Sequence, residues 1–183
     1  VTIEKQGLSG EMRTLLAWPD RMRVDSAVAE QFERYAFDGE NSRTVSSLKP
    51  VAILEGERAQ LLRLESPFAR YGDWKRWYPE AHVIQKISGG GKEVVLIRSG
   101  DTSAPARTLY IDLEKGGILA EDSMTFIETL GRIGQHVEFG DYRDVSGMFL
   151  PFRTEIEYAH SMIGTITTTV TDYELGVELP EGV

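Results

Sequence analysis

The stretch from Phe139 to Tyr158, FGDYRDVSGMFLPFRTEIEY, has the pattern of two β-strands joined by a tight turn. Asp144, Ser146 and Gly147 stand in its middle, and these residue types tolerate a left-handed backbone or bond their own main chain. Pro151 has no amide hydrogen to donate, so we expect it at the start of a strand, at a bulge or on an edge. Because apolar residues are dense on both sides of the turn, the stretch predicts a hairpin in a sheet with a large hydrophobic core or concavity.

The first third of the chain predicts short antiparallel strands followed by one helix. Apolar and polar residues alternate over the ranges 11–18, 22–28, 31–38 and 42–47, with turn residues between them. The period then changes, because Leu61, Leu64, Phe68 and Tyr71 recur at helical spacing. We expect a helical segment over residues 55–72, which Pro67 should kink or divide.

Strands resume after this helix and continue to the end of the chain. The patterns indicate strands over 82–87, 93–98, 107–113, 118–126, 153–160 and 165–173, in addition to the first strand of the hairpin. Gly131 and Gly134 predict a loop between two of them. With about ten or eleven strands and one helical segment, the fold class is mainly β. We expect an unclosed, highly curved antiparallel barrel whose concave face the helix covers.

Composition excludes several classes of function. The chain has 183 residues, which is most simply one domain, with 41% hydrophobic and 27% charged residues. Its net charge of −9 argues against a nucleic-acid surface and gives no attraction to anionic lipids. No apolar run approaches the length of a membrane helix, so membrane contact would be peripheral at most. The absence of cysteine excludes disulfides, thiolate metal sites and a cysteine nucleophile.

The order of these motifs resembles the LolA/LolB-like superfamily, which includes bacterial periplasmic lipoprotein carriers and the sensor RseB. The closer resemblance is to its outer membrane lipoprotein-sorting protein-like domains, and it runs over nearly all of residues 1–183. Two motifs carry it, a tyrosine-aspartate strand with a glycine turn and a D-Y-R-x-V-x-G-x-x-x-P-F hairpin. The matching positions are Tyr110, Ile111, Asp112 and Gly116, and Asp141, Tyr142, Arg143, Val145, Gly147, Pro151 and Phe152.

The resemblance implies an open antiparallel barrel wrapped over helices, with an apolar cavity that takes lipoprotein acyl chains. It also implies a periplasmic or secreted protein. The family has a helix before its first strand, whereas this sequence starts at Val1 with VTIEKQ, which alternates like a strand already under way. We therefore expect a LolA-like domain without that N-terminal helix, processed or taken from a longer chain.

Apolar residues on the early strands are the candidates for binding a hydrophobic ligand. For each aromatic residue, plain core packing is the stronger alternative to ligand contact. The three aromatic residues after the helix, Trp74, Trp77 and Tyr78, suggest either a lid or partner contact, or an anchor for the helix end. The candidate lining residues are Met12, Leu16, Trp18, Met22, Val24, Phe32 and Phe68.

Motifs for metal binding or catalysis are weak. His136 and Glu138 lie two apart and would share a strand face, but no third ligand is in view, so exposed strand residues are the favoured interpretation. Asp141 and Asp144 flank Arg143, which we expect to pair with a carboxylate across the sheet. There is no G-x-S-x-G elbow, and Gly89 to Gly91 predict a hairpin turn rather than a phosphate loop. The sequence predicts no catalytic residue, metal or cofactor.

The leading hypothesis is non-enzymatic binding of lipid or lipoprotein acyl chains in the bacterial envelope. The alternative is a structural or interaction domain of a larger periplasmic or secreted protein, with a filled core. An enzyme is the third hypothesis, and a carboxylate-lined cavity would be its first sign. The polarity of the space between sheet and helix distinguishes the three, while the sequence leaves the ligand, the partner and the oligomeric state open.

Overall fold

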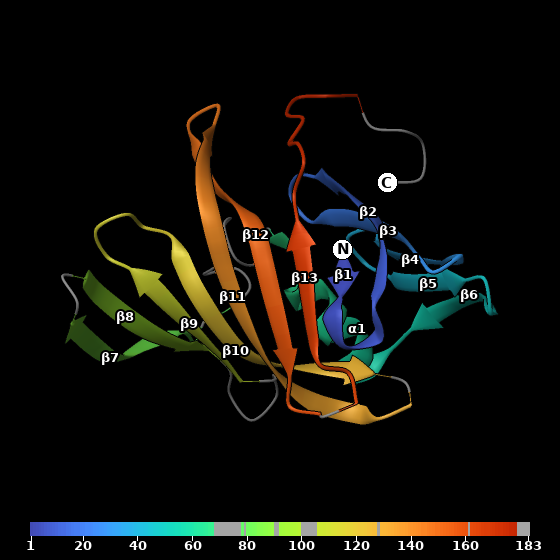
Figure 1. Ribbon diagram of the computed structural model, residues 1–183, viewed down its shortest axis with the longest axis horizontal. Coiled ribbons are helices and arrows are strands. Elements are labelled where there is room, and N and C mark those ends of the chain that lie inside the picture. The colour runs from blue at the N-terminus through green and yellow to red at the C-terminus, as the bar shows by residue number, and fades with distance from the viewer. Residues whose placement is uncertain are drawn as a thin grey trace.

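The computed structural model (Figure 1) describes residues 1–67, 78, 80–89, 92–99, 106–127, 129–160 and 162–178. Its elements follow the chain in this order: β1 (Thr2–Ile3), the 3-10 helix η1 (Glu4–Gln6), β2 (Leu8–Ala17), β3 (Arg21–Val28), β4 (Gln31–Phe37), β5 (Ser42–Ser46), β6 (Lys49–Leu54), α1 (Gly56–Leu64), β7 (His82–Gly89), β8 (Lys92–Ser99), β9 (Arg107–Asp112), β10 (Ile118–Ile127), β11 (Gly131–Val145), β12 (Met148–Tyr158) and β13 (Thr165–Thr169).

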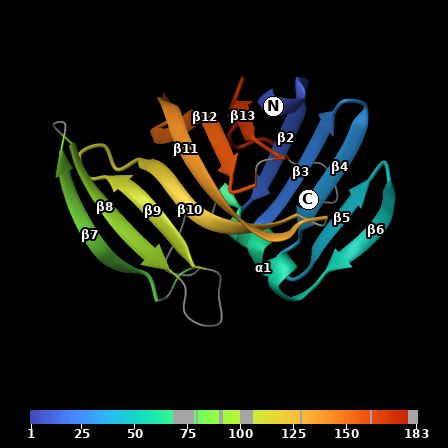
Figure 2. The ribbon, with the colours of Figure 1, turned by 60° about the horizontal axis from the view of Figure 1, so that its bottom comes forward.

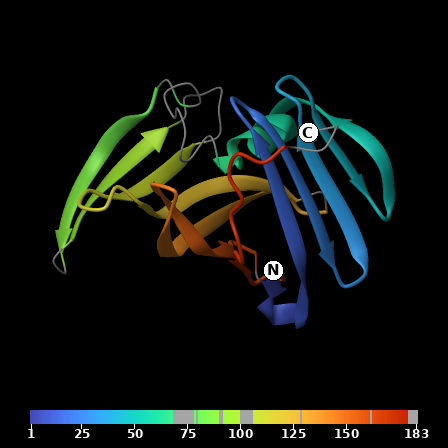
Figure 3. The same ribbon diagram turned by 90° about the horizontal axis from the view of Figure 1, so that it is seen from above.

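All the strands form one 13-stranded antiparallel sheet in the order β6-β5-β4-β3-β2-β1-β13-β12-β11-β10-β9-β8-β7. The two ends of this order, β6 and β7, do not pair with each other, so the barrel is open. Figures 2 and 3 show the sheet curving around α1, which lies between β10 and the strands β2 to β6. The predicted fold class, an unclosed antiparallel barrel with a helix on its inner side, is confirmed.

The long hairpin forms as its sequence predicts. β11 and β12 pair from Gln135–Tyr158 to Val145–Met148, and the turn uses Ser146 and Gly147 at φ values of 53° and 85°. The Gly147 amide donates to Asp144 Oδ1 over 3.2 Å. Pro151 lies opposite Tyr142, and the pairing of β12 with β13 begins only at Arg153. Pro151 therefore occupies a stretch of β12 that is paired on one side, as expected for a residue without an amide hydrogen.

Two sequence expectations about strands were wrong. Strand β6 was missed because Pro50 breaks the pattern, yet β6 is an edge strand with Pro50 exposed, where a missing amide hydrogen is tolerated. Gly131 and Gly134 belong to β11 rather than to a loop, because pairing with β10 at Ile127 and Met124 holds them in the sheet. The sheet consequently has more strands than the ten or eleven expected.

α1 covers the first part of the segment expected over residues 55–72, and the helix is interrupted just before Pro67, where the sequence predicts a kink or division. α1 ends at Leu64, before Pro67, and buries Leu61, Leu62 and Leu64. The predicted contribution of Tyr71 falls outside the described residues. Within the part of the chain that the structure describes, no helix is both long and apolar enough to cross a membrane.

Candidate ligand-binding site

The inner face of the strands β2 to β6 carries an apolar cluster beneath α1. Met22, Leu54 and Leu62 are its buried members. The register places Leu16 and Phe37 on either side of Met22, and Tyr35 beside Val24, so alternate residues of the three strands share this face. Half-buried side chains pack against the buried members and extend the apolar surface: Leu16, Val24, Tyr35 and Ala59. We call these seven residues the inner apolar cluster.

Three predicted lining residues, Leu16, Met22 and Val24, come together in this cluster. Met12 lies opposite Ser26 on the same face, farther along β2, and is 45% exposed. Trp18 follows the end of β2 and is 66% exposed. Phe32 pairs with Ala27 and thus lies on the opposite, outer face from Met22, because strand residues alternate between faces.

The remaining predicted contacts lie elsewhere. Phe68, Trp74 and Trp77 are outside the described residues. Tyr78 is 6% exposed and packs with Leu64 and Ala81, and the Arg107 guanidinium carbon lies 5.8 Å from the centre of its ring. The structure thus places Tyr78 in a buried contact with the end of α1.

A second apolar cluster lies on the other half of the sheet. Leu109, Ile118, Val137 and Phe139 are buried together, and Ile111, Tyr142 and Ile156 pack against them. Val137 lies opposite Ile156 in the β11–β12 register, so neighbouring strands contribute to one surface. The hairpin that decides the fold thus supplies part of this core.

A row of buried polar residues lies beside this second cluster on the same face of the sheet. Arg107 donates from Nη1 to the Leu64 carbonyl over 2.5 Å, and its Nε lies 3.2 Å from Glu121 Oε1. Thr125 donates to Glu65 Oε1 over 3.0 Å, which adds another link between α1 and β10. Gln135 Nε2 donates to Ser123 Oγ over 3.1 Å. We call Arg107, Glu121, Ser123, Thr125 and Gln135 the inner polar row.

The sequence did not reveal the inner polar row, because β10 has polar residues at both odd and even positions. Alternation therefore does not show which of them face inward. Glu121, Ser123 and Thr125 point inward, while Asp122 belongs to the outer face. Pairing with the buried Arg107 is what lets a carboxylate occupy the inside of the sheet. Glu65, which accepts from Thr125 of this row, also acts on a nearby phenol: burial, together with the Glu65 charge, raises the pKa of Tyr158 to about 12.

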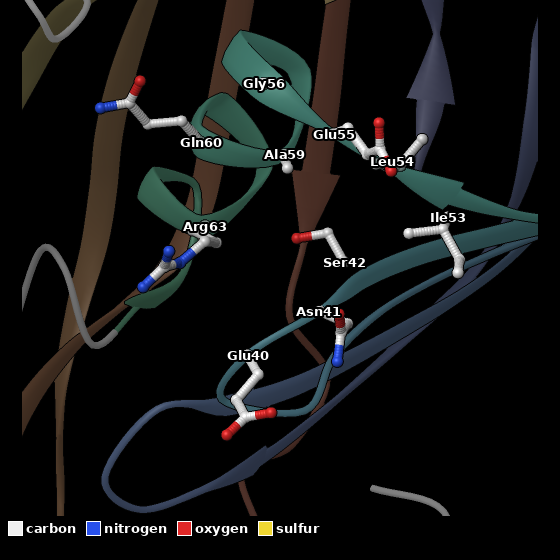
Figure 4. A pocket seen from close by; sticks show the side chains of 10 residues that line it. All are labelled: Glu40, Asn41, Ser42, Ile53, Leu54, Glu55, Gly56, Ala59, Gln60 and Arg63. Atoms are coloured by element: carbon white, nitrogen blue, oxygen red, sulfur yellow. The ribbon is translucent and has the colours of Figure 1, made fainter.

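A cavity of about 450 Å³ opens where α1 starts, next to the inner apolar cluster. Figure 4 shows side chains from the β4–β5 turn, from β5 and β6, and from one face of α1 around it. Its lining residues are Glu40, Asn41, Ser42, Ile53, Leu54, Glu55, Gly56, Ala59, Gln60 and Arg63. Leu54 and Ala59 belong to both the cavity and the inner apolar cluster, so the two sites are continuous.

The β4–β5 turn beside the cavity is held by Asp38. Its Oδ1 accepts the amide hydrogens of Asn41 and Glu40 over 2.8 and 3.0 Å, and its Oδ2 lies 3.1 Å from Arg43 Nη2. The Asn41 and Glu40 amides, with a smaller effect of Arg43, hold the pKa of Asp38 below its usual value. The turn therefore keeps its geometry at neutral pH, and with it the positions of Glu40 and Asn41.

The outer face carries the polar residues that the sequence considered for metal binding or catalysis. Asp122 accepts from the Tyr110 hydroxyl and lies 2.6 Å from His136 Nδ1, while His136 Nε2 is 3.7 Å from Glu138. The described residues include no group of three that could hold a metal ion.

One expectation about Arg143 was wrong. Arg143 pairs with Asp141 on its own strand, at 2.5 Å, and not with a carboxylate across the sheet. Residues two apart on a strand share a face, which places the two side chains next to each other.

Comparison with solved structures identifies the architecture. A DUF1329 family protein from Desulfovibrio piger superposes with a TM-score of 0.61, at 9% identity over 93% of this chain and 80% of its own. A Vibrio parahaemolyticus domain, provisionally described as an outer membrane lipoprotein-sorting protein, gives a TM-score of 0.57 at 10% identity over 92% and 78%. The chain has a LolA-like fold.

A LolA superfamily protein from Nitrosomonas europaea aligns with this LolA-like chain at a TM-score of 0.50, with 10% identity over 91% of this chain and 86% of its own. The sequence matches no family model and no curated protein. At such low identity the likeness concerns the fold, and function has to be argued from the residues of the site.

Proposed function

We propose that the protein binds a hydrophobic ligand with the chemistry of a lipid acyl chain, on the inner face of its sheet, without acting on it as an enzyme. The observation that carries the proposal is the inner apolar cluster. Leu16, Val24 and Tyr35 of this cluster are only half-buried, although they face the inside of a strongly curved sheet. Apolar surface on a concave face is what a ligand of this kind covers.

The energetics favour such a ligand. Each methylene that moves from water to an apolar surface contributes about 0.8 kcal/mol, so an acyl chain of more than about ten methylenes gains roughly 8 kcal/mol or more, from which the cost of association is subtracted. α1 has nine residues and contacts the sheet at β5 and β10. The likeness of the fold to a lipoprotein-sorting domain and to a LolA superfamily protein supports the same ligand class and a place in the bacterial envelope.

A pair of variants on β3 tests the proposal. Val24 lies on the inner face in the cluster, whereas Ala27 is exposed on the outer face. We expect Val24→Glu to weaken binding of a fluorescent long-chain fatty acid by at least about tenfold, because the carboxylate must lose water or exclude the chain. Ala27→Glu, which adds the same charge on the other face, should leave the affinity within about twofold.

Purified wild-type protein should also carry lipid that native mass spectrometry detects. A wild type that stays empty and takes up no fatty acid would contradict the proposal and favour the interaction domain with a filled core. Equal weakening by the two variants would show that the fatty acid binds outside the inner face. Circular dichroism of both variants checks that their folds are intact.

A further inference from the structure

The cavity at the start of α1 differs in chemistry from the inner apolar cluster beside it. Two carboxylates, Glu40 and Glu55, and one guanidinium, Arg63, line it together with the amides of Asn41 and Gln60. Leu54 and Ala59 form its boundary with the cluster. A ligand whose apolar part lies on the cluster would therefore place its polar end in this cavity.

Ser42 gives independent evidence that a polar ligand atom belongs in the cavity. Its side chain is 2% exposed, and within the described part of the chain its Oγ has no hydrogen-bond partner. Figure 4 shows this hydroxyl pointing from β5 toward α1, on the side of the cavity. Leaving a buried hydroxyl unsatisfied is unfavourable, and a polar ligand atom at this point would satisfy it.

The helix start adds a preference for an oxyanion. α1 begins after Glu55, whose side chain makes no capping hydrogen bond to the first turn. The amides of a first helical turn favour an anionic group. Arg63, on the same helix face, adds a positive charge to the lining, and its guanidinium carbon lies 4.6 Å from the centre of the Phe37 ring.

The carboxylates add a preference for a cation. With Glu40 and Glu55 against Arg63, the lining residues carry one more negative than positive charge, which disfavours a ligand that is only anionic. A primary ammonium has three hydrogens to donate to carboxylates. A quaternary ammonium has none and is held by aromatic rings, and no aromatic residue is among those that line the described cavity.

We propose that this cavity binds a zwitterionic head group that contains a phosphate and a primary amine, as in phosphatidylethanolamine. This inference rests on the proposed function, since the acyl chains occupy the inner apolar cluster. The phosphate binds near Ser42 and the first-turn amides of α1, with Arg63 adding positive charge, and the ammonium pairs with Glu40 or Glu55. The same chemistry is present in free O-phosphoethanolamine, so the experiment must separate the head group from the lipid.

The test compares short-chain phosphatidylethanolamine, phosphatidylglycerol and phosphatidylcholine with identical acyl chains, by calorimetry on the wild-type protein. We expect phosphatidylethanolamine to bind at least about tenfold more tightly than the other two lipids. The double variant Glu40→Gln/Glu55→Gln should lose this preference and bind all three lipids with similar affinity. Glu157→Gln, on an exposed position of β12, is the matched control and should keep it.

The outcomes separate this inference from the proposed function. Equal binding of the three lipids by the wild type, unchanged in the double variant, would overturn the head-group site and leave lipid binding intact. Binding of O-phosphoethanolamine alone, with chemical-shift changes at Ser42 and Gln60, would support the head-group site and contradict the acyl-chain function. Failure of every lipid and of O-phosphoethanolamine to bind would overturn both.

Discussion

At the scale of single residues, the buried phenols show how the inside of the sheet controls ionisation. Burial, and then the Glu65 charge, raise the pKa of Tyr158 to about 12. Burial and a hydrogen bond with Glu33 raise the pKa of Tyr35 far above its usual value. In both cases the folded protein disfavours the phenolate, because the charged form would lose water and face a carboxylate.

The sign of these shifts predicts the stability of the protein in alkali. A phenol with a raised pKa contributes stability that is fully present below its ordinary pKa of about 10 and is lost as the pH rises toward the folded value. We expect the free energy of unfolding, from urea titrations, to fall between about pH 10 and 12. Tyr158→Phe should make this fall shallower, and an unchanged slope would contradict the assignment of the raised pKa to Tyr158.

At the scale of elements, the β11–β12 turn connects the two longest strands. Gly147 has φ of 85° and no atom within 4 Å of the position of an added Cβ. The requirement for glycine is therefore a matter of backbone conformation and not of space. Ser146 also has a positive φ, at 53°, which asparagine tolerates better than serine.

We expect Gly147→Ala to lower the free energy of unfolding by about 1–2 kcal/mol, the cost of a left-handed backbone for a residue with a Cβ. Ser146→Asn should raise it by a few tenths of a kcal/mol, as suits a type I′ turn. Gly140→Ala on β11 is the control, because Gly140 has no positive φ and no atom near its added Cβ. Urea denaturation measures all three, and equal effects of the two alanine variants would be inconsistent with a backbone cause.

At the scale of the whole molecule, Arg107 and Glu121 join the helix to the sheet. The two side chains are 2% and 0% exposed, and Arg107 reaches the Leu64 carbonyl at the end of α1. A buried pair of this kind contributes little net energy compared with apolar residues of the same size, but the loss of one partner leaves a buried charge behind. The pair therefore links the end of α1 to the inner face of the sheet.

We expect Arg107→Met to lower the free energy of unfolding by about 3–5 kcal/mol, and the double variant Arg107→Met/Glu121→Met to recover most of that loss. A double-mutant cycle in urea gives the coupling energy. Additive effects of the two substitutions would show that the pair is not coupled. A single variant that unfolds with wild-type stability would show that α1 is held by its apolar contacts alone.

The sequence by itself determined most of the elements and the class of fold. Alternation with period two predicts β2 to β5 and β7 to β10, and the turn at Ser146 and Gly147 follows from residue type, because both signals depend on neighbours along the chain. The change to helical spacing near Leu61 predicts α1. The order of these elements already resembled the LolA-like arrangement that the superpositions confirm.

Only the tertiary structure decided how these elements meet. The two halves of the sheet are joined where Ile3 of β1 pairs with Ile166 of β13. No local sequence pattern predicts this contact. Pairing with Met124 keeps Gly134 within β11, and pairing with Ala27 places Phe32 on the outer face. Arg107 and Glu121 meet inside the sheet, and the cavity forms where α1 faces Ser42, because burial and charge pairing depend on residues that are distant in the chain.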